Sequence, residues 1–177
     1  MARVAPATPP LAPAAQQELD RQLAAHGRVT QMKRTLAHSP RALLALMEWY
    51  PLRDEVAGFL GERLTTLFAH AVSTETECLI CSTFFRRVLL EIGENPDALR
   101  LDERDRAIVE YGLALTRNSA HVTDPVYQAA ANHLTAPQMV ALTAFGGMMI
   151  ATNVVNNALR VDLDDYLEPY RRPGSVK

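Results

Sequence analysis

The sequence predicts an all-α fold, arranged as a single-domain bundle of about six to eight helices. Its 177 residues fit one domain and can bury a substantial core. Apolar residues recur at helical spacing along most of the chain, and it lacks the alternating runs bounded by Asn-Gly or Asp-Gly that indicate strands. We expect a flexible, proline-rich arm over residues 1–13 and one helical domain over residues 14–170.

The first helices are expected from their end signals. A helix over residues 14–25 should end at Gly27, and a short helix or turn follows over 30–37. Ser39 and Pro40 form an N-cap and a first-turn proline for the next helix. Pro51 is expected to start a new segment.

The later helices follow in the same way. Residues 62–72 have helical periodicity, and residues 74–77 (Thr-Glu-Thr-Glu) fit a capping box that opens the next helix, which should end at Gly93. Asp102, residues 124–125 (Asp-Pro) and Thr135 are the next three helix starts. The last helix, 136–159, is apolar nearly all round, which predicts a central, buried position in the protomer or at a subunit interface.

Composition excludes several classes of protein. The formal charge of −2 leaves no basic field for a nucleic acid partner. No uninterrupted apolar run reaches the roughly 20 residues that span a bilayer, and the N-terminus lacks the apolar segment of a secretory signal. We therefore expect a cytoplasmic protein without a membrane partner. The sequence contains no phosphate-binding loop and no metal-ligand spacing, so we expect no cofactor and no metal.

The clearest chemical feature is the pair Cys78 and Cys81, three residues apart near a helix start. Cysteines at this spacing lie on one helical face, within or near the range that a disulfide bridges. The positive end of a helix favours thiolate, although Glu75 and Glu77 would oppose it. The pair is therefore interpreted as redox-active, with two alternatives: inert core thiols and, less well supported because further ligands are missing, structural zinc.

The run from Ala71 to Cys81 (Ala-Val-Ser-Thr-Glu-Thr-Glu-Cys-Leu-Ile-Cys) carries a resemblance to a known family. Two further segments support it, residues 101–114 and the Asn-rich end of the last helix. Together they resemble the carboxymuconolactone decarboxylase superfamily, in particular its alkylhydroperoxidase D-like branch, over about residues 30–165. The resemblance implies an all-helical fold and a homo-oligomer, such as a dimer, trimer or hexamer. It also implies that Cys81 attacks peroxide, that Cys78 resolves the product, and that a dithiol partner such as a lipoyl protein re-reduces the disulfide.

The sequence departs from that family's pattern at its proton relay. Phe85 stands where the family has a histidine, Thr66 where it has a glutamate, and Ile80 where a further histidine can stand. None of these side chains serves as a base near neutral pH, and such a relay typically contributes about 10²–10⁴-fold in rate. We therefore expect weak peroxidase activity. His70, one turn after Thr66, is the candidate substitute base, against the alternative of a polar or interface histidine.

Three interpretations of function remain open from the sequence. The first is a thiol-dependent oxidoreductase that cycles a Cys78–Cys81 disulfide. The second is a non-redox, decarboxylase-like enzyme on the same scaffold, and the third is a helical oligomer that has lost catalysis. Asn153, Asn156 and Asn157 either form hydrogen bonds across subunits or line a pocket, because buried amides need partners.

Overall fold

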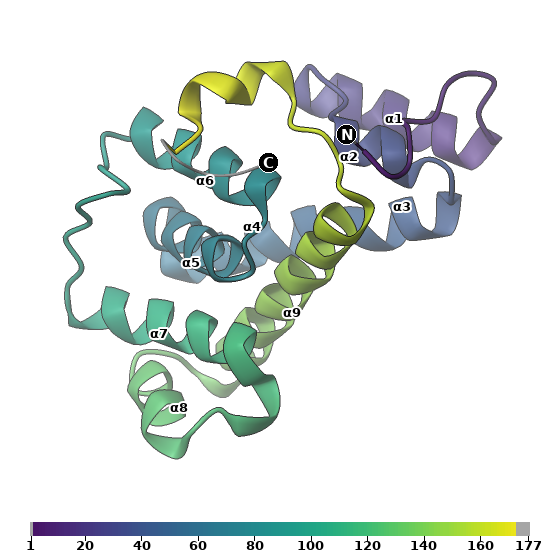
Figure 1. The fold of residues 1–177 in the computed structure, drawn as a ribbon. Helices are drawn as coiled ribbons and strands as arrows, with labels where there is room; N and C mark the ends of the chain where they lie inside the picture. Colours follow the sequence, from purple (N-terminus) through teal and green to yellow (C-terminus); the bar gives the residue numbers. More distant parts are fainter. Residues whose placement is uncertain (1, 173–177) are drawn as a thin grey trace.

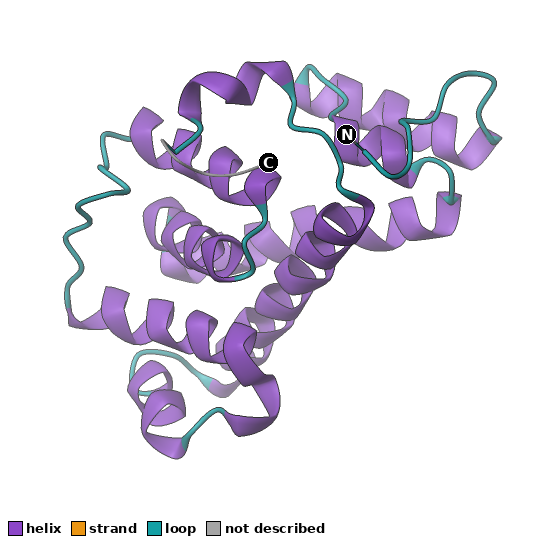
Figure 2. Ribbon diagram, in the orientation of Figure 1, coloured by secondary structure: helices purple, strands orange, loops and turns teal. Residues whose placement is uncertain are grey.

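Helix α5 (Glu62–Glu75) lies at the centre of the fold, between α6 (Leu79–Glu91) on one side and α7 (Glu103–Asn118) on the other (Figure 1). We describe residues 2–172 of a computed structural model. Within them the elements of secondary structure are all helices, joined by loops, with no strand (Figure 2). Eight of the fourteen residues of α5 are buried, including Leu67, Phe68 and Val72. The predicted all-α class is confirmed.

The other helices surround this centre. The remaining α-helices are α1 (Pro13–His26), α2 (Gln31–Leu36), α3 (Pro40–Met47), α4 (Trp49–Leu60), α8 (Asp124–Ala131) and α9 (Ala136–Leu159), and short 3₁₀ helices cover Ser119–His121 (η1) and Asp165–Tyr170 (η2). The described residues thus form nine α-helices, against about six to eight expected. The segment expected to start at Pro51 begins two residues earlier, as α4. The N-caps predicted at Ser39, Asp102 and Thr135 are confirmed, and Thr30 also caps its helix, since its side chain accepts from Lys33 N–H.

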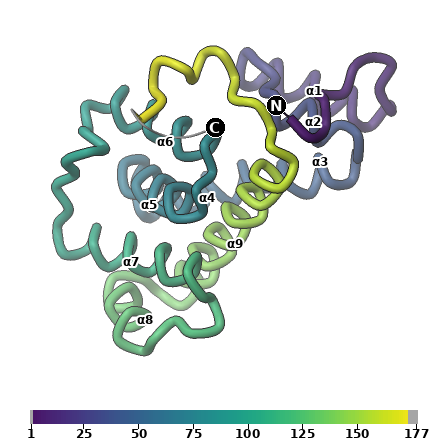
Figure 3. The backbone as a smooth tube through the Cα atoms, in the orientation of Figure 1, coloured from purple at the N-terminus to yellow at the C-terminus, as the bar shows by residue number. Residues whose placement is uncertain are grey.

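The N-terminal helices form a second, smaller layer. Helices α1 to α3 share their own cluster of buried side chains, which includes Leu19, Leu36 and Leu43. The tube view shows this layer beside the upper end of α9, with the C-terminal segment crossing back over α6 (Figure 3). The segment before α1 lies against these elements: Arg3 N–H donates to Leu159 O (2.9 Å) and Ala7 N–H to Arg34 O (3.1 Å). Its flexibility stays a prediction.

Helix α9 packs on α4, α5 and α7 and supplies Leu142, Phe145 and Met149 to the core. By length and composition it is the one helix in residues 2–172 that could cross a membrane, but apolar core helices meet the same criterion. It is not wholly buried, because Val140 and Val154 are 70% and 58% exposed. This exposed side fits the expected homo-oligomer, which stays a prediction.

Close helix packing explains two glycines. A Cβ on Gly112 of α7 would lie 2.7 Å from the Phe68 ring, and one on Gly146 would lie 3.0 Å from Leu115 and 3.2 Å from the same ring. Phe68 is fully buried and stacked on Phe145, with ring centroids 5.9 Å apart. The side chains of Leu115 and Phe68 therefore leave no room for a Cβ at Gly146.

We predict that Gly112→Ala lowers the free energy of unfolding by about 1–3 kcal/mol, because the added methyl overpacks the core at Phe68. Gly58→Ala is the matched control, since its Cβ would meet nothing within 4 Å in the last turn of α4. There, alanine should stabilise by about 0.5–1 kcal/mol through helix propensity. Urea unfolding measures both; equal effects of the two substitutions would contradict the packing argument.

Candidate functional site

A sharp turn between α5 and α6 positions the two cysteines. Thr74, which a capping box over residues 74–77 makes the cap of α6, lies inside α5, and the hydroxyl of Thr76 donates back to Val72 O (3.0 Å) in α5. Glu77 follows with a φ of 54°, and Cys78 N–H donates to Ser73 O (3.0 Å). The capping box predicted over residues 74–77 is therefore wrong: α5 runs on through Glu75. Cys78 itself is the N-cap residue of α6, and Cys81 lies in its first turn.

Three asparagines of α9 hold this turn. Asn153 Nδ2 donates to Thr76 Oγ1 (2.8 Å), and Asn157 Nδ2 donates to Thr76 O (2.7 Å). Asn156 Nδ2 points at both thiols, 3.4 Å from Cys81 Sγ and 3.7 Å from Cys78 Sγ. The Nδ2 groups of these amides thus bond within the chain, whereas Oδ1 of Asn153 and of Asn156 is buried without a hydrogen bond among the described residues. A hydrogen bond across subunits stays a prediction.

The two thiols share a proton unequally. The pKa of Cys78 is lowered, first by the Cys81 thiol that donates to it and further by the N–H groups of Cys81 and Ile80 and by Asn156, against the effect of burial. The two backbone N–H groups stabilise the Cys78 thiolate through the positive electrostatic field at the start of α6, since the Cys78 side chain accepts no capping hydrogen bond. The pKa of Cys81 is raised well above the usual value, by proton donation to Cys78, by burial and by the charge of Cys78. Thiolate therefore forms first on Cys78.

Cys81 lines a cavity of about 120 Å³ that Cys78 does not reach. The cavity lies between the N-terminal layer, α6, α9 and the C-terminal segment. Its wall is mainly apolar and aromatic, with a few polar groups. The residues that line it are Thr30, Met32, Lys33, Leu46, Met47, Trp49, Tyr50, Ile80, Cys81, Phe84, Phe85, Met149, Thr152, Asp164, Tyr166 and Leu167. An apolar cavity of about 150 Å³ holds a molecule the size of benzene. The site thus places one thiol beside space for a small organic molecule.

The polar residues of this cavity wall were not among the site residues predicted from the sequence. Lys33 is 3% exposed, and burial lowers its pKa to about 8. Burial raises the pKa of Tyr50 to about 12 and also raises the pKa of Asp164. Lys33 precedes the cysteines by more than 40 residues, and α2 is mainly polar and also contains the exposed Arg34, so no local signal distinguishes Lys33.

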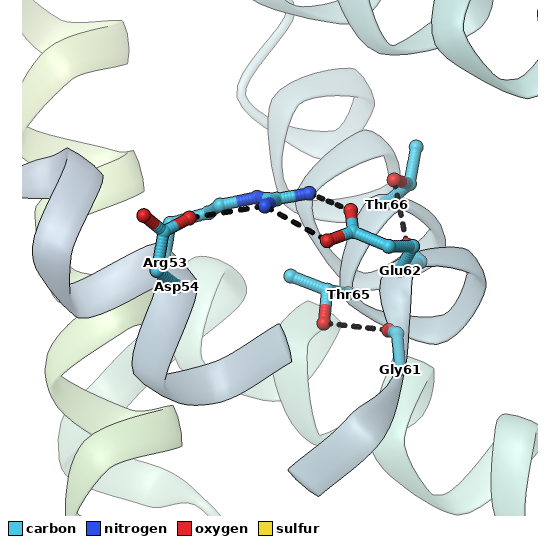
Figure 4. A network of polar contacts seen from close by, with 6 residues as sticks. All are labelled: Arg53, Asp54, Gly61, Glu62, Thr65 and Thr66. Atoms are coloured by element: carbon cyan, nitrogen blue, oxygen red, sulfur yellow. Dashed lines mark hydrogen bonds and ion pairs between the residues drawn. The ribbon is translucent and has the colours of Figure 1, made fainter. Parts of the chain in front are cut away.

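The relay positions supply no base to the thiols. Thr66 is buried and its hydroxyl donates to its own helix, at Glu62 O (2.8 Å). Figure 4 shows this bond and the Glu62 carboxylate turned toward Arg53, whose Nη1 lies 3.1 Å from Glu62 Oε1. Phe85 packs into the cavity wall, 6.3 Å from the Trp49 ring between centroids.

His70 lines a different cleft from Cys81. That cleft also contains Thr83 and Arg86 from α6 and Asp97 from the loop that follows. Burial, and then the charge of Arg86, lowers the pKa of His70 to about 4. The structure brings Cys78, Cys81 and Asn156 together and leaves His70 outside that group.

We predict that Cys81→Ala raises the pKa of Cys78, because Cys78 loses the thiol that donates to its sulfur. Titration of the ultraviolet thiolate absorbance measures this without requiring a reagent to reach the buried sulfur. Cys78→Ala is the matched control, and its remaining thiol should titrate above the Cys78 thiol of the native pair. An unchanged titration in Cys81→Ala would contradict the shared proton.

We also predict that His70 makes the fold less stable in acid. Its folded pKa of about 4 lies below the usual value near 6.5, so the unfolded chain binds the extra proton between these pH values. The free energy of unfolding should fall as the pH drops from 6.5 to 4, by an amount on the order of 2 kcal/mol. His70→Gln should remove this part of the slope, and replacing the exposed His133 should not; urea unfolding at several pH values decides.

Comparison with known proteins supports the fold. The sequence matches no family model and no curated protein, whereas several solved structures are similar throughout. A peroxidase-related protein with an alkylhydroperoxidase AhpD core from Ralstonia eutropha JMP134 is 21% identical, with a TM-score of 0.64 over 89% of this chain and 88% of the other. A peroxidase-related protein from Silicibacter sp. TM1040 is 19% identical, with a TM-score of 0.71 over 93% and 92%.

A third similar structure is the debrominase Bmp8, which is 16% identical, with a TM-score of 0.72 over 94% of this chain and 95% of that one. A cysteine-to-alanine variant of it was solved with 2,3,4-tribromopyrrole. At these identities the likeness concerns architecture. The chain has the fold of these alkylhydroperoxidase AhpD-like structures, in agreement with the all-helical fold that its resemblance implies.

Proposed function

We propose that the protein is a dithiol–disulfide oxidoreductase that reduces a small organic hydroperoxide through Cys81 and Cys78. The observation that carries this proposal is the position of Cys81, in the cavity wall and bonded to the lower-pKa thiol of Cys78. The substrate would lie against Cys81, and Cys78 would stay behind it, shielded from the cavity. This arrangement supports the order of attack that the family resemblance implies.

In the first step the Cys78 thiolate acts as the general base that the missing relay would otherwise supply. It accepts the Cys81 proton across the shared hydrogen bond while Cys81 Sγ attacks the terminal oxygen of the hydroperoxide. The O–O bond breaks and Cys81 becomes a sulfenic acid. The departing alkoxide takes the proton of the sulfenic hydroxyl and leaves as the alcohol, and Cys78 passes its proton to that sulfenic oxygen.

In the second step the Cys78 thiolate attacks Cys81 Sγ. The disulfide forms and hydroxide leaves, so that two thiols and one hydroperoxide give a disulfide, an alcohol and water. Asn156, which points at both sulfurs, would keep them facing each other. An external dithiol, such as a lipoyl protein, would then reduce the disulfide by thiol–disulfide exchange.

A second candidate reaction is reductive debromination of a small aromatic molecule by the same dithiol. The aromatic cavity wall and the similarity to Bmp8 favour it. Cys81 would take the bromine from the ring carbon, a proton would replace it there, and Cys78 would displace bromide as the disulfide forms. Release of bromide from a bromopyrrole, together with loss of two thiols, would distinguish this reaction from peroxide reduction.

We predict different fates for the two cysteine variants when one equivalent of cumene hydroperoxide is added. Cys78→Ser should stop at a trappable sulfenic acid on Cys81, because the resolving thiol is missing. Cys81→Ser should give neither sulfenic acid nor cumyl alcohol at the native rate. Mass spectrometry with a sulfenic-acid trap reads out both variants.

The native protein is the control in the same experiment, and it should lose two hydrogens as the Cys78–Cys81 disulfide forms. Peroxide reduction at the native rate in Cys81→Ser would reject the assignment of Cys81. Native thiols that stay reduced until the protein unfolds would reject the redox proposal and favour inert core cysteines.

A further inference from the structure

We propose that the cavity beside Cys81 selects small molecules that carry an acidic group, a carboxylate or a phenolate, by pairing that group with the ammonium of Lys33. The inference rests on the proposed function for the identity of the reactive thiol, but it concerns binding and is tested by binding. It predicts a substrate with an apolar, ring-sized body and one negative charge.

Lys33 carries a buried charge that lacks a direct counter-ion. Its Nζ donates to Gln22 Oε1 (2.7 Å) and lies 5.0 Å from the centre of the Tyr50 ring. No carboxylate within residues 2–172 forms an ion pair with it. An ammonium offers three donors, and burying one without an opposite charge is costly. An anion in the cavity would supply both an acceptor and the charge.

The nearby carboxylates do not fill that role. Glu18 is bonded through both oxygens to Arg21, at 2.8 and 2.7 Å, and reaches Lys33 only through the Gln22 amide. Asp164 also lines the cavity, but its Oδ1 accepts the Gln31 N–H (2.9 Å), and burial raises its pKa. Lys33 thus makes its direct contacts with the neutral side chains of Gln22 and Tyr50, while the charges of Glu18 and Asp164 raise its pKa from a distance. One hydrogen bond leaves its ammonium two further donors.

The rest of the wall suits the body of such a ligand. Trp49, Phe84 and Phe85 supply aromatic surface, and Cys81 supplies the thiol. Arg28 and Arg87 lie over the Tyr166 ring, with Cζ 4.1 and 5.5 Å from its centre, and add positive charge behind that wall. A small aromatic acid matches this combination better than a neutral molecule of the same shape.

Trp49 makes the test direct, because it is the chain's single tryptophan and lines the cavity. A bromine atom that contacts an indole ring quenches its fluorescence. We would titrate the reduced native protein with 4-bromobenzoate and with 4-bromobenzamide, which has nearly the same shape without the charge. The benzoate should quench saturably and bind at least about tenfold more tightly.

Two variants connect that preference to Lys33. Lys33→Gln should bring the benzoate and benzamide affinities within about twofold of each other. Lys33→Met, which keeps the length of the side chain and removes its charge, should do the same and serves if Lys33→Gln does not fold. Arg34→Gln is the matched control, since it removes a positive charge from the same helix at an exposed position and should keep the preference.

Equal affinity for the two probes, no binding of either, or a benzoate preference that survives both Lys33→Gln and Lys33→Met would overturn the proposal. These outcomes are separate from the redox chemistry. A native protein that forms its disulfide with cumene hydroperoxide but ignores the charge of the probe would refute anion selection alone. A protein that prefers benzoate but never oxidises would refute the redox function alone.

Discussion

The site depends on the contact between the Asn-rich end of α9 and the turn that joins α5 to α6. Asn153 and Asn157 bind Thr76 from two sides, and Asn156 reaches the thiols. The turn is tight, with Glu77 in the left-handed region, so it needs this support to hold its shape. Because the turn is fixed, Cys78 occupies the N-cap of α6, and Cys81 follows one turn later at the cavity.

From this placement the two thiols acquire different properties in one environment. Cys78 is fully buried yet receives the thiol proton of Cys81 and the field of the helix start, so it is the better thiolate. Cys81 has the higher pKa of the two, but it is the thiol that lines the cavity. Dividing acidity and access between two sulfurs lets one act as base for the other. The proposed chemistry can then proceed although Thr66 and Phe85 stand at the relay positions.

The fold could be predicted from the sequence, because helix starts such as Asp102 and Thr135 carry local signals that depend on a few neighbouring residues. The cysteine pair was visible for the same reason. The capping box predicted over residues 74–77 was wrong, because a Thr-Glu pattern can also end a helix. The threonine hydroxyl then donates to a carbonyl of the preceding turn, as Thr76 does to Val72 O. The place of Lys33 in the cavity wall, and of His70 in another cleft, depends on how distant helices pack, and no local pattern encodes that.

The central claim is that Cys78 and Cys81 form a dithiol that exchanges with a disulfide while the protein stays folded. A redox titration of the native protein in dithiol–disulfide buffers, with the disulfide counted by mass spectrometry, tests it most directly. The account predicts one two-electron transition, at a potential within the range of dithiol carriers, about −120 to −270 mV, with helical content unchanged. Thiols that remain reduced across all buffers until the protein unfolds would contradict it and leave the pair as core packing.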